Sequence, residues 1–191
     1  MEESRPIKPM TSKTRLWVFG YGSLLWKHSH PSTQLKVCFI QNFERRLWQG
    51  SPDHRGSPQF PGRVATLIDA PGKRCWGLAQ QVPDEDAYNT LLQLDQREQA
   101  GYERLIVPLH DENGVFEQEG LVYRASESNP HYLGPASVNE MVEHILSCEG
   151  PSGANTEYVL RLDEALQKMH CPDMHIGEIA AAIRNEVGHG L

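Results

Sequence analysis

The hydrophobic pattern of the chain changes about two-thirds of the way along, and this change constrains the fold more than any other feature. Before about residue 124, short runs rich in β-branched and aromatic residues alternate with turn residues, which is typical of strands. After residue 137, apolar residues recur at the three- and four-residue spacing of helices. Strands first, with one helix inserted and others appended, predict an α+β domain rather than an alternating βαβ fold.

The same patterns predict the individual elements. The expected strands are residues 16–19, 35–43, 63–69, 74–82, 103–109 and 115–123, with a long loop at 49–62 and a hairpin-type turn at 70–73. The expected helices are one capped by Asp84 that ends at Arg97, one with a capping box of Ser137 and Glu140, one capped by Asn155, and one over residues 176–187. We expect residues 1–15 to be a flexible N-terminal tail and residues 16–191 to be a single domain.

Composition and charge exclude several classes of protein. Of the 191 residues, 39% are hydrophobic and 23% are charged, which excludes a wholly disordered chain, collagen and a coiled coil. A formal net charge of −7 at pH 7 argues against nucleic-acid binding, because an acidic chain repels phosphate backbones. The sequence has no apolar run of about 18 residues, the length that a membrane span requires.

The cysteines predict a compartment. Cys38, Cys75, Cys148 and Cys171 are too widely spaced for a zinc site, and they form no disulfide framework. We therefore expect a reducing, cytoplasmic location, with Cys38 and Cys75 as small core residues.

Gly20 and Gly22 follow the first predicted strand closely. Two glycines let the backbone approach a ligand, and successive N–H groups in such a turn can cradle an anion. The dinucleotide-binding fingerprint would need a third glycine where Leu25 stands. On spacing alone, a tight turn after a strand is the better explanation of the pattern.

The segment from residue 44 to residue 63 is basic in an otherwise acidic chain. It contains the cations Arg45, Arg46, Arg55, Arg63 and His54 against the two acids Glu44 and Asp53. Arginine forks bind carboxylates in two places at once, so this segment suits a small acidic substrate. The alternative is that these arginines form structural ion pairs. The nine histidines show no spacing typical of a zinc site.

Glu98 is a candidate general base at the end of the first predicted helix. A carboxylate at a helix C-terminus lies against the helix dipole, which would raise the pKa of Glu98 toward neutrality. A general base that works near neutral pH needs such a pKa. Most glutamates at helix ends are simply solvated, so the pattern alone does not single out this one.

Taken together, these motifs resemble the ChaC family, the glutathione-specific γ-glutamylcyclotransferases. The resemblance rests on six segments in the family's order: VFGYGSLLW (18–26), WQGSPDHRG (48–56), PGRV (61–64), REQAGY (97–102), YLGP (132–135), and GPSG (150–153) leading to Asn155, Glu157 and Tyr158. The sequence departs from the family pattern at Gln99, where a lysine is usual, and at Pro52, where a threonine is common.

The resemblance implies a small mixed β-barrel flanked by helices and the cleavage of glutathione to 5-oxoproline and cysteinylglycine, without a cofactor or metal. Glu98 matches the family's acid/base residue. The segment that matches the substrate-binding loop comprises Val18, Phe19, Gly20, Tyr21, Gly22 and Ser23. Tyr158 is expected to hydrogen-bond the γ-glutamyl group, and Arg55 or Arg63 to steady a carboxylate or the site itself.

Two other functions stay open at this point. One is a cyclotransferase for other γ-glutamyl amino acids or amines, which a panel of substrates would distinguish. The other is a non-catalytic γ-glutamyl-binding or interaction module, for which an acid/base carboxylate at Glu98 would serve little purpose. The sequence leaves the oligomeric state open.

Overall fold

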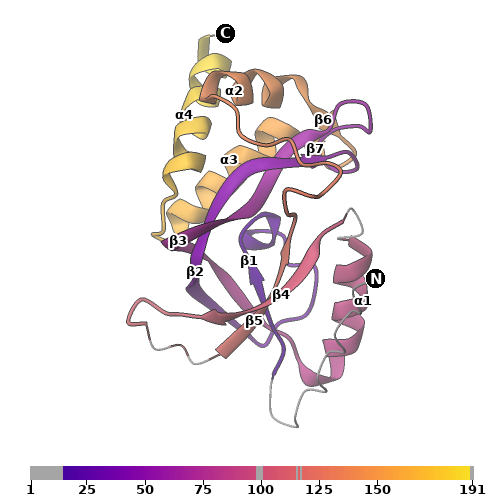
Figure 1. The fold of residues 1–191 in the computed structure, drawn as a ribbon, viewed down its shortest axis with the longest axis vertical. Coiled ribbons are helices and arrows are strands. Elements are labelled where there is room, and N and C mark those ends of the chain that lie inside the picture. The colour runs from indigo at the N-terminus through magenta and orange to yellow at the C-terminus, as the bar shows by residue number, and fades with distance from the viewer. Residues whose placement is uncertain (1–14, 98–100, 115, 117, 190–191) are drawn as a thin grey trace.

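A mixed five-stranded sheet forms the centre of the molecule (Figure 1). The computed structural model describes residues 15–97, 101–114, 116 and 118–189. The strands are β1 (Trp17–Gly20), β2 (Gln34–Ser51), β3 (Gly62–Gln81), β4 (Glu103–Leu109) and β5 (Gln118–Arg124), in the spatial order β2–β3–β1–β5–β4. β1 and β5 are parallel, and the other neighbours are antiparallel. With helices appended to this sheet, the predicted α+β class is confirmed.

The two edge strands of the sheet meet at one point. Phe39 in β2 and His110, just after β4, exchange backbone hydrogen bonds of 2.8 and 2.9 Å. The sheet therefore curls toward a barrel. Among the described residues, however, no continuous ladder joins β2 to β4, so the expected barrel is only partly closed.

The predicted hairpin turn at residues 70–73 is wrong. β3 runs through it, and both halves of β3 pair with β2, so that Asp69 lies opposite Phe43 and Arg74 lies opposite Gln41. Residues 70–73 form a bulge opposite Asn42, whose φ is 66° and whose side chain accepts a 2.9 Å hydrogen bond from the Gly72 N–H. The Pro-Gly turn signal is local, whereas β2, at 18 residues, is long enough to pair with both halves of β3.

The helices are α1 (Ala87–Arg97), preceded by the 3₁₀ turn η2 (Asp84–Asp86), and α2 (Val138–Ser147), α3 (Asn155–Lys168) and α4 (Met174–His189). A short hairpin of β6 (Glu149–Gly150) and β7 (Gly153–Ala154) separates α2 from α3. None of the described helices combines the length and apolar character needed to cross a membrane.

The predicted caps have mixed outcomes. The Ser137–Glu140 capping box is confirmed, because the Glu140 N–H donates to Ser137 Oγ and the Ser137 N–H donates to Glu140 Oε2. The predicted caps at Asp84 and Asn155 are wrong. Asp84 is itself part of the η2 turn. Asn155 is the first residue of α3, and its side chain bonds instead to the backbone of β3.

The core lies on both faces of β1. Trp17 and Phe19 point into the larger hydrophobic cluster, which packs β2 and β3 against α2, α3 and α4. Val18, with the opposite orientation, joins the smaller cluster that includes Leu94 of α1. In Figure 1, the three C-terminal helices accordingly lie together on one side, and α1 lies apart beside β4.

Candidate active site

The candidate site begins where β1 ends. After Gly20, the chain turns into the short 3₁₀ helix η1 (Ser23–Leu25). A Cβ atom added to Gly20 would lie 2.6 Å from the Cβ of Leu24, and one added to Gly22 would lie 3.0 Å from the Tyr158 hydroxyl oxygen. Both glycines are therefore needed for close packing, and at Gly22 the close neighbour is a polar group of the site itself.

This turn forms one wall of a pocket. The other walls come from the loop after β2, from β3, from the start of α3 and from residues near β4 and β5. The pocket brings together seven of the ten site residues predicted from the sequence: Phe19, Gly20, Tyr21, Gly22, Ser23, Arg55 and Tyr158. Their assignment to substrate binding stays a prediction.

Tyr158 lies one turn into α3 and reaches across to the sheet. Its hydroxyl oxygen accepts a 3.1 Å hydrogen bond from the N–H of Ala65 in β3. Its ring packs edge-on against Trp26, at 5.5 Å between the ring centroids. A phenol can accept one hydrogen bond and donate another, so this side chain is fixed in place while it carries a donor into the pocket wall.

Arg55 connects the loop after β2 to the start of α3. Its Nη1 donates to the carbonyl of Ala154 at 2.9 Å and to Glu157 Oε2 at 3.0 Å. The guanidinium carbon lies 5.8 Å from the centre of the Tyr158 ring. These contacts hold a buried guanidinium, paired with Glu157, at the edge of the pocket.

Two predicted site residues lie elsewhere. Val18 is fully buried in the smaller hydrophobic cluster and does not line the pocket. Arg63 is also absent from the lining, because its Nη1 donates to the carbonyls of Leu47 and Gly134 at 2.9 and 3.1 Å. Arg63 joins three segments of the framework that surrounds the pocket.

Glu98 lies outside the described residues. Before it in the sequence, α1 ends at Arg97. After it, Tyr102 lines the pocket. Near the end of α1, Asp95 Oδ1 accepts a 2.7 Å hydrogen bond from the hydroxyl of Tyr123, another lining residue. Asp95 also forms an ion pair with Arg104 of β4.

The arginines of the basic segment, residues 44–63, make different kinds of contact. Arg46 pairs with Glu44 at 2.6 Å, and Arg45 and Arg63 are buried in contact with backbone carbonyls. Of these arginines, only Arg55 lines the pocket. The alternative of structural ion pairs holds for Arg45, Arg46 and Arg55, which pair with Asp173, Glu44 and Glu157.

Sequence reasoning missed several residues of the pocket. Lining residues absent from the prediction include Lys27, Asp53, His54, Tyr102, Tyr123 and Ser152. Of these, Asp53, His54, Tyr102 and Ser152 stand within the segments that carry the family resemblance, so membership of such a segment was the available signal. Tyr123 comes from β5, and only the parallel pairing of β5 with β1 places it there.

Among the described residues, no group of three or more His, Cys, Asp or Glu side chains could hold a metal ion. The prediction that Cys38 and Cys75 are core residues is confirmed, because both are buried. Burial raises the pKa of the Cys38 thiol to about 12, and burial likewise raises the pKa of Cys75. Both side chains are therefore thiols, not reactive thiolates, at neutral pH.

Known proteins are similar to this chain in sequence and in fold. A zebrafish (Danio rerio) protein named "Glutathione-specific gamma-glutamylcyclotransferase 1" is 39% identical over 186 residues, which cover 94% of each chain. An Arabidopsis thaliana protein named "Gamma-glutamylcyclotransferase 2-3" is 37% identical over 177 residues, which cover 89% of each chain. The crystal structure of a selenomethionine-labelled yeast γ-glutamyl cyclotransferase specific to glutathione matches with a TM-score of 0.81 and 29% identity, over 91% of this chain and 97% of that one.

The family model described as ChaC-like protein matches residues 16–186, which include the five-stranded sheet, the pocket, α1, α2, α3 and most of α4. The zebrafish and Arabidopsis proteins match this chain over 94% and 89% of their own length, so the sequence comparisons and the family model indicate the same family. This chain belongs to the ChaC-like family.

Proposed function

We propose that this chain is a lyase-type γ-glutamylcyclotransferase that converts glutathione to 5-oxoproline and cysteinylglycine. The observation that carries the proposal is one pocket that unites the Gly20–Gly22 turn, Arg55 and Tyr158 in a member of the ChaC-like family. Relatives in zebrafish and yeast have names that specify glutathione, which supports this substrate over other γ-glutamyl compounds.

The proposed chemistry is an intramolecular displacement. The α-amine of the γ-glutamyl group attacks the γ-amide carbonyl carbon, a new C–N bond closes a five-membered ring, and the bond to the cysteine nitrogen breaks. One proton passes from the attacking nitrogen to the leaving nitrogen, and no water is consumed. Because nucleophile and electrophile belong to one molecule, the enzyme chiefly has to hold the folded conformer.

Glu98 is the proposed acid/base for this proton transfer. At neutral pH the attacking amine is largely protonated, so a base must first remove a proton, which the same carboxyl group can then return to the leaving nitrogen. Support comes from the chain itself. Tyr102 lines the pocket four residues after Glu98, and the intervening chain spans at most about 14 Å.

The remaining groups of the pocket bind and stabilise charge. The backbone N–H groups of Tyr21, Gly22 and Ser23 are the proposed donors to the developing oxyanion and the α-carboxylate. Tyr158 is the proposed donor to the γ-glutamyl group, and Arg55 provides a positive charge for a carboxylate. We assign Val18 and Arg63 to the framework of the pocket instead of to direct contact with substrate.

The proposed reaction transfers no electron and needs no cofactor. We also propose that the protein is cytoplasmic, which agrees with four cysteines that are all free thiols and with a substrate that is a reduced thiol. Fractionation of cells that express the tagged full chain tests this location. Recovery with an organelle fraction would contradict it.

A substrate panel tests the proposed function. Purified protein is incubated with glutathione, with γ-glutamyl amino acids and with γ-glutamyl amines, and 5-oxoproline is quantified. We expect rapid release of 5-oxoproline from glutathione and slow release from compounds that lack the cysteinylglycine group. Release from the other compounds alone would assign a different substrate, and no release from any would favour a γ-glutamyl-binding module.

A further inference from the structure

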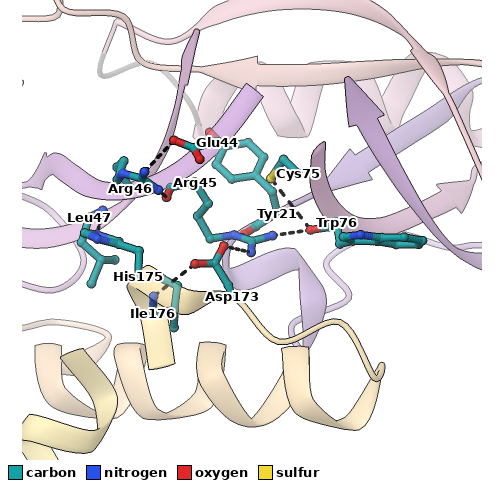
Figure 2. A network of polar contacts seen from close by, with 10 residues as sticks. All are labelled: Tyr21, Glu44, Arg45, Arg46, Leu47, Cys75, Trp76, Asp173, His175 and Ile176. Carbon is teal, nitrogen blue, oxygen red and sulfur yellow. Dashed lines mark hydrogen bonds and ion pairs between the residues drawn. The ribbon is translucent and has the colours of Figure 1, made fainter. Parts of the chain in front are cut away.

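Arg45 is buried directly behind the pocket turn, at 1% exposure, and all three of its guanidinium nitrogens have partners (Figure 2). Nε donates to the Tyr21 carbonyl at 2.7 Å, Nη1 donates to Asp173 Oδ2 at 2.8 Å, and Nη2 donates to the Trp76 carbonyl. One side chain from the middle of β2 thus joins the pocket turn, β3 and the segment that leads into α4.

The bond to Tyr21 fixes the orientation of a whole peptide group. The amide between Tyr21 and Gly22 is planar and trans, so its carbonyl and its N–H point in opposite directions. Arg45 lies outside the pocket lining and binds the carbonyl from the core side. The N–H of Gly22 therefore points away from Arg45, and Gly22 itself lines the pocket.

Asp173 holds Arg45 in this position from the other side. Its Oδ2 pairs with Arg45, its Oδ1 accepts the Ile176 N–H at 3.2 Å, and its carbonyl accepts the Gly177 N–H at 2.8 Å. The first turn of α4 thereby orients the carboxylate. Two residues later, His175 Nε2 accepts the Leu47 N–H at 3.1 Å, which attaches the same turn to β2 beside Arg45.

We propose that Arg45 and Asp173 are positioning residues that aim the Gly22 N–H at the reacting carbonyl. None of the described residues of α4 lines the pocket, so on this proposal the C-terminal helix supports catalysis through one ion pair. The expected loss of turnover rests on the proposed function. The orientation of the Tyr21–Gly22 peptide does not.

The test compares variants of this pair with a second ion pair on the same helix. Arg184 of α4 binds Asp163 of α3 at 2.7 Å, close to the 2.8 Å of the Arg45–Asp173 pair, but its guanidinium pairs with α3, whereas Arg45 also binds the pocket turn. Asp173→Asn and Arg45→Met weaken or remove the positioning contact. Arg184→Met removes an ion pair of similar length whose arginine is more exposed than Arg45, and it is the control.

We expect Asp173→Asn to lower kcat about 10-fold and Arg45→Met about 100-fold, since removal of a single oxyanion donor costs 10²–10³-fold in well-studied enzymes. KM should change less than about 3-fold, because the contact acts mainly in the transition state. Arg184→Met should keep kcat within about 2-fold of the wild type. An equal loss of kcat in the control, or none in Arg45→Met, would overturn the proposal.

A double variant separates positioning from stability. Arg45→Met combined with Asp173→Asn removes both charges while the asparagine oxygen can still accept the Ile176 N–H, and removal of the unpaired buried charge commonly restores stability. We expect its melting temperature to exceed that of Arg45→Met while kcat stays low, because the Tyr21 carbonyl still has no guanidinium partner. If kcat recovers along with stability, the role of the pair is structural only and the proposal fails.

The amide NMR resonance of Gly22 provides a readout that does not depend on turnover. We expect it to shift, and its hydrogen exchange to accelerate, in Arg45→Met and in the double variant but not in Arg184→Met. If the wild type failed to cleave glutathione, the proposed function would fall, yet this resonance would still test the orientation of the peptide. An unchanged Gly22 resonance in Arg45→Met would refute the positioning role.

Discussion

At the scale of single residues, buried arginines shape the backbone around the pocket. Arg45 and Arg63 together donate to four backbone carbonyls, those of Tyr21, Trp76, Leu47 and Gly134. A carbonyl oxygen carries only a partial negative charge, and a guanidinium has several N–H donors. Each arginine can therefore bind more than one carbonyl. The sequence could show that arginines gather here, but their different partners depend on contacts between residues up to 128 positions apart.

Glu98→Gln tests the acid/base assignment. Glutamine keeps the size of the side chain but can neither take up nor return a proton at neutral pH. We expect a fold unchanged by circular dichroism and a turnover number lowered about 10²–10⁴-fold, the usual contribution of a general acid–base group. Gln96→Glu, two positions earlier in α1, makes the reverse exchange of the same two side chains; it is the control and should stay active. A Glu98→Gln variant with near-normal turnover would contradict the assignment.

Gly22→Val tests the close approach of the turn to its ligand. The new Cβ would lie 3.0 Å from the Tyr158 hydroxyl oxygen, so the valine displaces that hydroxyl or the turn itself. We expect at least about a 10-fold loss of kcat/KM, as expected for a distorted site. Gly188→Val, where an added Cβ meets nothing within 4 Å, is the control. Equal kinetics in both variants would show that the turn has no part in binding.

At the scale of elements, local signals predicted well and long-range pairing did not. β4 has the predicted bounds, and the Ser137–Glu140 capping box is present, because both depend on residues close together in the sequence. The hairpin turn predicted from the Pro-Gly sequence at residues 70–73 is wrong because the two halves of β3 pair with β2 and not with each other. Asn155 failed as a cap for the same kind of reason, since its side chain bonds to β3.

Asn155→Ala measures that long-range contact. Asn155 is fully buried, and its side chain accepts from the Arg63 N–H at 2.6 Å and donates to the Arg63 carbonyl at 2.7 Å. Loss of both bonds leaves buried polar groups unpaired, so we expect unfolding to become easier by about 2 kcal/mol or more in urea titration. Ser137→Ala, an exposed cap, should cost about 1 kcal/mol. A smaller cost at Asn155 than at Ser137 would contradict this account.

At the scale of the whole molecule, α4 connects the other C-terminal helices, α2 and α3, to the sheet. It also carries a titratable side chain, His175. The neutral His175 ring accepts the Leu47 N–H. Burial, as the larger cause, and the nearby Arg46 together lower the pKa of His175 from 6.5 to about 4. The unfolded chain therefore binds a proton at His175 between about pH 6.5 and pH 4 that the folded protein does not bind.

This difference makes stability depend on pH in a definite direction. As pH falls through that range, the wild type should lose up to about 3 kcal/mol of stability through His175. His175→Gln cannot titrate, so its stability relative to the wild type should improve as the pH is lowered from 7 to 4.5. Urea titrations of both proteins at the two pH values measure this. A stability difference that does not change with pH would show that His175 titrates normally in the folded state.

The most direct test of the central claim follows oxygen from water into the products of glutathione cleavage. Purified protein and glutathione are incubated in ¹⁸O-labelled water, and the masses and amounts of the products are measured by mass spectrometry. Intramolecular displacement predicts unlabelled 5-oxoproline and cysteinylglycine in equal amounts, because no water enters the reaction. Labelled glutamate, or 5-oxoproline that contains ¹⁸O, would mean hydrolysis and would contradict the proposed mechanism.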